Sequence, residues 1–370
     1  MKGRADRLST RALNRALLDR QRLLRRSTHG ALDTIEHLVG LQAQVPNAPY
    51  LALWTRLARF QAGDLTTLIT ARQVVRLALM RSTIHMVSAR DCLTMRPLMQ
   101  AVLDRALAGT FGRRLSGIDP AALATAGRAA VAEQPLTLAA IGVRLARRWP
   151  DRDPEALAHA VRALVPLVQV PPRGVWGQGG IAAHTPAEEW LGRSRAARPS
   201  MAAMIRRYLG AFGPASVRDV QAWSGLASLR EPVERLRPRL RTFTNANGVE
   251  LFDVPDAPRP HPDVAAPPRF LPEFDNLLLA HADRSRVVPH AHRPRLFGAG
   301  GLMTGTFLLD GFVGGRWSVA RVRTRPILSV ELLAPVKRSD RAALEHEGQR
   351  LLAFVAGDGE GHDVRFLRRR

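Results

Sequence analysis

Apolar residues recur at spacings of three and four through the first part of the chain, as they do along one face of an α-helix. Three such runs predict amphipathic helices: Leu13–Leu18, Leu32–Val39 and Leu51–Phe60. The second helix should end near Gln44, because the Pro46 turn follows it. Two shorter apolar runs flank Arg81 and Ser82 and predict paired strands over Val74–Met80 and Thr83–Val87. Helices followed by a small hairpin are the order of elements in a winged helix.

The same order appears twice more along the chain. Within residues 133–185, and again within 201–253, a short strand is followed by two helices and a pair of strands. Thr137 and Ser216 hold matching positions before the first helix, where hydroxyl side chains cap free backbone N–H groups. Asn247-Gly248 between apolar pairs is a strong hairpin signal. We therefore predict an internal repeat of about 70 to 80 residues.

The last third of the chain has a different pattern. A proline-rich connector over residues 256–268 leads into short apolar runs separated by glycine. These runs predict strands over Phe270–Leu271, Leu277–Leu279, Phe307–Leu309, Phe312–Val313, Trp317–Arg321 and Ile327–Leu333. A helix is expected over Ser339–Phe354. The prediction is an α+β protein with domains over residues 1–118, 119–199, 200–255 and 256–370, the last of them β-rich.

The charge points to a polyanionic partner. The chain has 55 basic and 32 acidic residues, a formal net charge of +23, and all basic residues except Lys2 and Lys337 are arginine. A GC-rich genome explains the choice of arginine over lysine but not the excess. Guanidinium groups bind phosphate oxygens in pairs and release counterions, so we predict nucleic acid as the partner; a merely compositional excess is the alternative.

Several classes of protein are excluded or disfavoured by what the sequence lacks. Cys92 is the only cysteine, so the chain forms no internal disulfide and no thiolate zinc site. The histidines at 281, 290 and 292 are not joined by a carboxylate or cysteine in a recognisable pattern, so we predict no metal. The arginine-rich first thirty residues hold no apolar core, and no later run suits a membrane span. We expect a cytoplasmic protein with no membrane partner.

Gln42-Ala43-Gln44 is the candidate catalytic segment of the first domain. By spacing alone, two glutamines at the end of a helix are most simply solvated or bonded to free carbonyls. Five blocks change this interpretation: Leu38–Tyr50, Arg81–Asp91, Arg269–Leu279, Asp283–Ser285 and Leu309–Trp317. In these blocks, which span nearly the whole chain in the same order, the sequence resembles the AlkZ/YcaQ-type DNA glycosylases, a family of winged-helix proteins.

The resemblance implies a fold and an activity. It implies three tandem winged-helix motifs and a small C-terminal β-barrel-like domain that together form a concave, basic face. The family's catalytic motif is Gln-Φ-Gln or Gln-Φ-Asp, which corresponds here to Gln42 and Gln44. The implied reaction is hydrolysis of the N-glycosidic bond of N7-alkylated guanine, including bulky natural-product adducts and interstrand crosslinks. We accordingly expect a monomer that acts on double-stranded DNA carrying alkylated guanine and needs no cofactor.

The residues make that chemistry reasonable. Glutamine has no proton that titrates near neutral pH, so Gln42 and Gln44 must orient a water rather than act as general bases. An N7-alkylguanine is cationic and leaves as a neutral base, so no strong acid is needed. No lysine lies near the motif to form a Schiff base, which predicts a monofunctional glycosylase.

Other residues are candidates for DNA contact or for a role near the site. A bulky lesion is hard to flip into a tight pocket, so we expect a loop to probe a groove. The segment Arg284–Gly305 is the first candidate for that loop, through Arg284, His290, His292, Arg293 and Arg295. The wing at Thr244–Leu251 is the alternative. His85 has either a role near the site or a structural hydrogen bond, and Glu273 and Asp275 are either an acid/base pair or partners of arginines.

A different class of function stays open from the sequence. Tandem winged helices with an arginine excess also suit a non-catalytic DNA-binding protein or transcriptional regulator, or a damage binder that has lost turnover. Three copies in one chain argue for wrapping or bending a single duplex, since a regulator usually carries one copy and dimerises.

Overall fold

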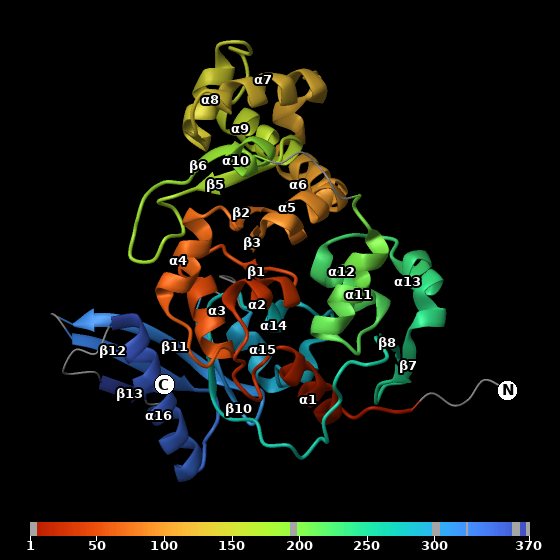
Figure 1. The fold of residues 1–370 in the computed structure, drawn as a ribbon, viewed down its shortest axis with the longest axis vertical. Coiled ribbons are helices and arrows are strands. Elements are labelled where there is room, and N and C mark those ends of the chain that lie inside the picture. Colours follow the sequence, from red (N-terminus) through yellow and green to blue (C-terminus); the bar gives the residue numbers. More distant parts are fainter. Residues whose placement is uncertain (1–5, 193–197, 298–303, 323–324, 357–362, 368–370) are drawn as a thin grey trace.

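The computed structural model of the chain describes residues 6–192, 198–297, 304–322, 325–356 and 363–367. Its described strands form sheets of six, five and two strands, and helices cover them (Figure 1). The mixed α+β class predicted from the sequence is confirmed. None of the described helices is long and apolar enough to cross a bilayer.

The first unit has the order of elements expected for a winged helix. Its elements are α2 (Ala31–His37), β1 (Leu41–Gln42), α3 (Ala48–Arg56), α4 (Ala62–Thr70), β2 (Val74–Ala78) and β3 (Ile84–Ser88). The predicted hairpin is present, because β2 and β3 pair antiparallel around a turn at Met80–Ser82. β1 pairs with the other edge of β3. Apolar residues of α2, α3 and α4 fill the core beneath this sheet.

Gln42 lies on strand β1 and Gln44 follows that strand, so the predicted place of the motif at a helix end is wrong. Helix α2 stops at His37, where Val39 (φ 57°) and Gly40 (φ 93°) turn the chain in the left-handed region. A Cβ atom at Gly40 would lie 2.7 Å from the Val87 side chain, so this close approach to β3 requires glycine. The turn therefore feeds Leu41 and Gln42 directly onto the edge of the sheet.

The second unit repeats this order, and the third repeats it without the predicted short strand, in whose place Ala215 and Phe252 form an isolated bridge. The second comprises α7 (Pro120–Ala132), β4 (Leu136–Thr137), α8 (Leu138–Ala146), α9 (Pro154–Leu164), β5 (Leu167–Val170) and β6 (Ala183–Pro186). The third comprises α11 (Met201–Phe212), α12 (Val217–Ser224), α13 (Arg230–Leu236), β7 (Arg241–Thr244) and β8 (Glu250–Asp253). Both predicted caps form: the Thr137 hydroxyl accepts from the Ala140 N–H at 3.2 Å and the Ser216 hydroxyl from the Asp219 N–H at 3.2 Å.

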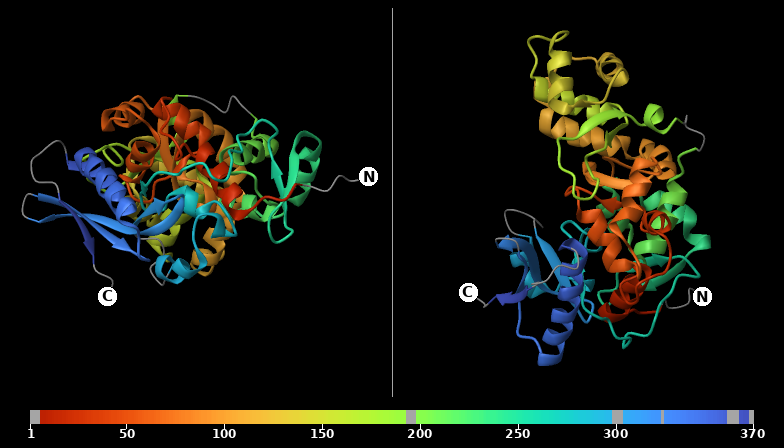
Figure 2. Two further views of the ribbon diagram at one scale, coloured as in Figure 1. Left: turned by 90° about the horizontal axis from the view of Figure 1, so that it is seen from below. Right: turned by 60° about the vertical axis from the view of Figure 1, so that its left-hand side comes forward.

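The first two units share one sheet. Strand β2 pairs with β5 antiparallel, which gives the strand order β1-β3-β2-β5-β6-β4. The second unit consequently projects from the first, as Figures 1 and 2 show. Residues 171–182 form a loop before β6, so the second strand of the pair predicted in this unit begins only at Ala183. Trp176 of that loop packs on Tyr50 of the first unit, with 4.9 Å between ring centroids.

Further helices connect these units. Helices α5 (Ala89–Met95), α6 (Gln100–Phe111) and α10 (Ala187–Leu191) link the first and second units. The N-terminal helix α1 (Thr10–Arg20) packs against α11 of the third unit and against the turn at Arg284–Arg286. Its Arg20 guanidinium donates to both carboxylate oxygens of Asp253, at 2.6 and 2.8 Å. The third unit therefore lies beside the start of the chain, although about two hundred residues separate them.

The C-terminal domain is an open sheet with one covering helix. Its strand order is β13 (Asp363–Leu367), β12 (Arg325–Leu332), β11 (Phe312–Val322), β10 (Gly305–Leu309) and β9 (Arg269–Leu271). Helix α16 (Arg338–Ala356) packs Leu344, Leu351 and Leu352 against this sheet, which buries the apolar face without closing it. The implied barrel-like closure is therefore not found in the described strands, whose outer edges are β9 and β13.

One predicted strand of this domain is a helix. Residues Leu277–Leu279 belong to α14 (Asn276–Leu279), because the Asp275 carboxylate caps the turn by accepting from the Leu277 N–H at 2.9 Å. A carboxylate before three leucines is a helix start, and the apolar run alone does not reveal it. This short helix brings Asn276 next to the first unit.

Candidate active site

Gln42 lies at the centre of the first unit's sheet edge, opposite His85. The register pairs Leu41 with Met86 and Gln42 with His85. The Ala43 N–H donates to the Ile84 carbonyl at 2.8 Å and extends the pairing by one residue. Because residues directly opposite each other in an antiparallel pair share a face, Gln42 and His85 project from the same face of the sheet. Gln42 is buried, with 7% of its surface exposed.

The side-chain oxygen of Gln42 is held by an arginine. Arg81 donates from Nη2 to Gln42 Oε1 at 2.7 Å and to Asn276 Oδ1 at 3.4 Å. Its Nη1 donates to the Trp223 carbonyl at the end of α12. Burial and the neighbouring Arg284 lower the pKa of Arg81 to about 10, so the group is cationic at neutral pH. Gln42 therefore sits beside a fixed positive charge.

Gln44 has a different environment from Gln42. Its side chain is exposed, and its Oε1 accepts from the Ile84 N–H at 3.2 Å. This bond continues the edge of β3 by using a side chain where a backbone carbonyl would otherwise pair. The two glutamines are brought together at one sheet edge, one buried and one facing solvent.

His85 is fully buried and uncharged. Its Nδ1 lies 3.0 Å from the Thr83 carbonyl, which makes Nδ1 the donor and leaves Nε2 as an acceptor. Within the described part of the chain, Nε2 has no hydrogen-bond partner. Burial and the charge of Arg81 lower the pKa of His85 to about 3. The structure shows the predicted structural hydrogen bond and places the buried imidazole opposite Gln42, whereas a role of His85 near the site stays a prediction.

Arg76 supports the motif from the opposite side of the sheet. This arginine is 3% exposed and donates from Nη2 to the Ala43 carbonyl at 2.7 Å. Its Nε and Nη1 find no partner among the described residues. Burial and Arg173 lower the pKa of Arg76 to about 10. The backbone between the two glutamines is therefore anchored by a buried cation.

A small pocket borders Gln42. Its lining includes Gly40, Pro272 and Asn276, and its volume of about 10 Å³ is close to what one water molecule needs. Asp275, on its wall, forms an ion pair with Arg56, with both N–O distances 2.8 Å. Asp275 is thus a partner of an arginine and not half of an acid/base pair. Burial raises the pKa of Glu273.

Comparison with known proteins places the chain in a family. The family model of the AlkZ-like DNA glycosylases matches residues 35–354. The chain belongs to the AlkZ-like DNA glycosylase family. Among solved structures, the DNA glycosylase AlkZ of Streptomyces sahachiroi is similar in fold, with a TM-score of 0.77 at 21% identity; the match covers 98% of this chain and 100% of that chain. No curated protein matches the chain.

The other predicted DNA contacts lie in the 284–295 segment, and none of them lines the small pocket beside Gln42. Arg284 lies near enough to Arg81 to affect its pKa, and its guanidinium is 4.3 Å from the Phe297 ring centroid. His292 is bonded to the Val313 carbonyl at 2.9 Å, while His290 and Arg295 are exposed. Residues 298–303 of the candidate loop lie outside the described residues.

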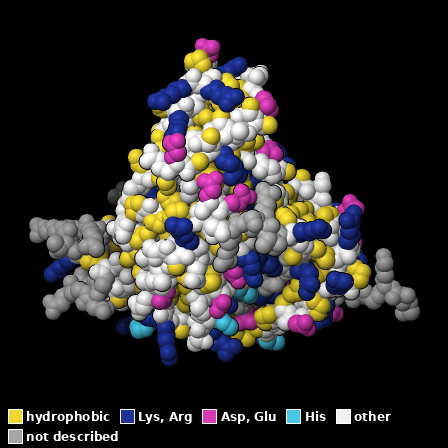
Figure 3. Space-filling model, turned by 45° about the horizontal axis from the view of Figure 1, so that its top comes forward, with side chains coloured by type: hydrophobic (Ala, Val, Ile, Leu, Met, Phe, Trp, Pro, Cys, Tyr) yellow, Lys and Arg dark blue, Asp and Glu magenta, His cyan; other side chains and the backbone are white. Residues whose placement is uncertain are grey.

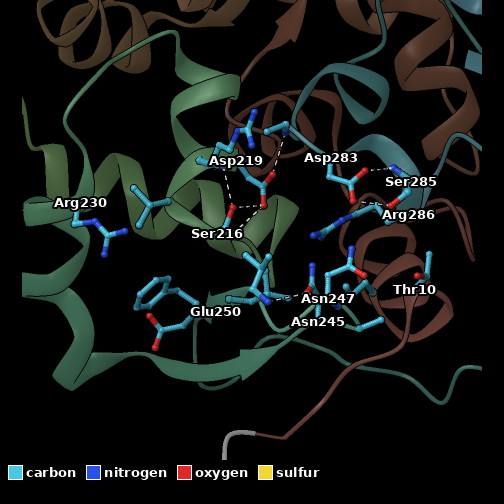
Figure 4. Close-up of a pocket in the computed structure, with 18 of the residues that line it drawn as sticks. Thr10, Ser216, Asp219, Arg230, Asn245, Asn247, Glu250, Asp283, Ser285 and Arg286 are labelled. Carbon is cyan, nitrogen blue, oxygen red and sulfur yellow. Dashed lines mark hydrogen bonds between the residues drawn. The ribbon is translucent and has the colours of Figure 1, made fainter. Parts of the chain in front are cut away.

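A larger pocket brings the two candidate DNA-contact segments of the glycosylase together. It has a volume of about 540 Å³ and lies between the 244–251 wing, the start of α12 and the Asp283–Arg286 turn (Figure 4). Arg293 also lines it and forms an ion pair with Asp283 at 2.8 Å. The wing therefore shares this hollow with part of the candidate loop, but of the five predicted contacts in that loop only Arg293 lines it.

The surface charge of the glycosylase is widely distributed. Figure 3 shows basic side chains over all parts of one face, with acidic side chains between them. Groups of three or more histidine, cysteine, aspartate or glutamate residues suited to a metal are not present in the described ranges. Charge alone therefore does not mark one patch as the DNA interface.

Sequence reasoning missed two residues of this site. Arg81 and Asn276 were within resembling blocks, but only as parts of a hairpin turn and of a supposed strand. The available signal was the pair Arg81-Ser82 at a tight turn, where asparagine and glycine are usual. An arginine at such a turn indicates that its side chain makes contacts that outweigh the unfavourable backbone conformation.

Proposed function

We propose that this glycosylase hydrolyses the N-glycosidic bond of N7-alkylated guanine in double-stranded DNA, with Gln42 and Gln44 orienting the attacking water. The observation that carries the proposal is the placement of both amides at one sheet edge, each with its oxygen fixed by a donor. Such fixed dipoles cost little reorganisation during the reaction.

The chemistry of the leaving group suits this site. An N7-alkylguanine departs as a neutral base, so the enzyme needs no proton donor of ordinary strength. His85, the imidazole beside Gln42, is neutral because its pKa is about 3, and it therefore does not act as a general acid near pH 7. The task left to the protein is to hold a water against C1′ of the sugar and to stabilise an oxocarbenium-like transition state.

The amides retain the capacity for that task. A carbonyl oxygen has two lone pairs, so Gln42 Oε1 keeps one after accepting from Arg81, and Gln44 Oε1 keeps one after accepting from Ile84. Gln42 also borders the pocket of about 10 Å³. With no lysine beside the motif in the sequence, we propose a monofunctional enzyme that leaves an abasic site.

We further propose how the protein reaches its substrate. The three repeated units act as tandem winged helices, with boundaries near residues 118, 199 and 255, in a monomer that spans one duplex. The 244–251 wing and the Arg284–Arg295 segment contact DNA from the walls of their shared hollow. A groove-probing contact, without full flipping of the base, suits bulky adducts and crosslinks as well as N7-methylguanine.

Base release tests the proposal directly. Duplexes carrying N7-methylguanine, a bulky N7 adduct or an N7 crosslink are incubated with the protein, and released base and alkali-labile sites are measured. We expect release from at least one, and a loss of about 100-fold or more in the Gln42→Ala/Gln44→Ala variant. Gln73→Ala, an exposed glutamine in the same unit, is the matched control and should keep full activity. Equal activity of the double variant would contradict the assignment.

A non-catalytic DNA-binding role is the second candidate, favoured by the net charge of +23 and the repeated units. The two functions differ in the same experiment. A regulator shifts one undamaged promoter fragment and releases no base, and a damage binder without turnover retains alkylated DNA intact.

A further inference from the structure

The turn between β2 and β3 has an unusual backbone for its residues. Arg81 (φ 53°) and Ser82 (φ 58°) are both in the left-handed region, as in a type I′ hairpin turn. Asparagine and glycine are preferred at those places, since a larger side chain is strained there. The chain nevertheless places an arginine at the first of them.

The guanidinium of Arg81 connects three parts of the molecule. It contacts Gln42 of the first unit, Trp223 of the third unit and Asn276 of the C-terminal domain. Asn276 in turn donates from Nδ2 to the Gly40 carbonyl at 3.2 Å, just before the motif. Arg81 and Asn276 therefore hold the motif strand from its start and from its side chain.

Arg81 has no carboxylate partner among the described residues, unlike an arginine that only stabilises the fold through an ion pair. Across the described ranges, no carboxylate forms an ion pair with it, and its charged neighbour Arg284 is also cationic. Its acceptors are two side-chain amides and one backbone carbonyl. A strained backbone and a partly buried charge without a carboxylate partner are both unfavourable for folding, so stability alone does not explain this residue.

We propose that Arg81 is a positioning residue of the glycosylase reaction, which fixes the side-chain amide of Gln42. Its donation to Oε1 sets the amide orientation, with Oε1 toward the guanidinium and Nε2 turned from it. The inference rests on the proposed function, and it predicts that Arg81 acts only through Gln42.

The test combines Arg81→Gly with Gln42→Ala in a double-mutant cycle. Single-turnover base release at saturating protein, DNA binding and urea unfolding are measured for the wild type, both single variants and the double variant. Arg81→Gly removes the side chain and suits the left-handed backbone, so the fold should persist. Ser82→Gly changes the neighbouring left-handed residue and is the matched control. Arg81→Lys keeps the charge with one donor group.

The expected results are specific. Arg81→Gly should slow base release by about 100-fold while DNA affinity stays within about twofold, because the water is misplaced and not the duplex. In the Gln42→Ala background the same change should cost less than about threefold. Ser82→Gly should keep the wild-type rate, and Arg81→Lys should recover part of it.

Other results would overturn the inference. Independent, multiplying effects of Arg81→Gly and Gln42→Ala on the rate, or a loss confined to DNA affinity, would show that Arg81 does not act through Gln42. A wild type that releases no base refutes the proposed function instead. The urea cycle then still decides whether Arg81 fixes Gln42, since additive effects on unfolding would mean that the two side chains are not coupled.

Discussion

Arginines that are buried or partly buried are compensated differently in two regions of this molecule. Where the first unit and helix α1 meet the rest of the fold, each of two buried arginines faces a buried carboxylate: Arg20 with Asp253 and Arg56 with Asp275. Behind the glutamine motif, Arg76 and Arg81 are also cationic, but their described acceptors are carbonyl and amide oxygens. Both regions bury charge, and only one neutralises it.

We infer that the arginines paired with carboxylates stabilise the fold, whereas those bonded to neutral oxygens orient the glutamine motif. A buried ion pair keeps its charges together, and removing one partner leaves the other uncompensated. A cation bonded only to neutral oxygens gains less electrostatic stabilisation than one paired with a carboxylate. It still fixes the orientation of the carbonyl and amide groups that accept its hydrogen bonds. Arg76 fixes the Ala43 carbonyl and Arg81 fixes the Gln42 amide, so in this region charge is used to orient the motif.

The largest effect is expected from breaking a neutralised pair. Asp275→Ala should lower the free energy of unfolding by about 3–5 kcal/mol, because Arg56 would stay buried without its carboxylate. Loss of the cap on the Leu277 N–H adds to the effect. Urea unfolding measures it, with the exposed Asp263→Ala as control. A loss below about 1 kcal/mol would contradict the distinction between the two regions.

Much of the fold was predictable because its patterns are local. The repeated helix-helix-hairpin order, the caps at Thr137 and Ser216 and the wing at Asn247-Gly248 all depend on neighbours in sequence. The pairing of β2 with β5, which merges two units into one sheet, is a contact between distant segments. Hydrophobic pattern carries no information about that partner, so the shared sheet could not be predicted.

The candidate site was predictable only in part. Gln42 and Gln44 were predicted as catalytic through the family resemblance, which stays a prediction, and they were wrongly expected at a helix end. Helix α2 stops early because Val39 and Gly40 adopt left-handed backbone, and a valine gives no warning of that. Arg81 and Asn276 reach Gln42 from a turn and from a separate domain, which only the folded chain brings together.

The next effect is expected on acidification at His85, and it is smaller per pH unit than the loss in Asp275→Ala. His85 has a pKa of about 3 in the folded state and an ordinary value of 6.5 when unfolded. The unfolded chain therefore binds a proton first as the pH falls. Stability from the neutral imidazole is complete above pH 6.5 and is lost as the pH falls toward 3, at about 1.4 kcal/mol per pH unit.

The variant His85→Gln isolates that contribution. Urea unfolding between pH 6 and 4 should show a pH slope smaller by about 1.4 kcal/mol per unit than in the wild type. Base release should show no change near pH 6.5 that depends on His85, because the folded imidazole does not titrate there. An unchanged slope would mean that the site accepts the imidazolium.

The smallest effect is expected from removing Arg76, a cation that pairs with no carboxylate among the described residues. In Arg76→Met, the Ala43 carbonyl loses its donor, which costs about 1–3 kcal/mol. The removal of a buried charge whose Nε and Nη1 have no partner among the described residues offsets that cost. The free energy of unfolding should therefore change by no more than about 1 kcal/mol, whereas Arg56→Met should lose at least about 3 kcal/mol because Asp275 is left alone. Urea unfolding of the two variants side by side measures the contrast, and equal losses would show that Arg76 is as structural as Arg56.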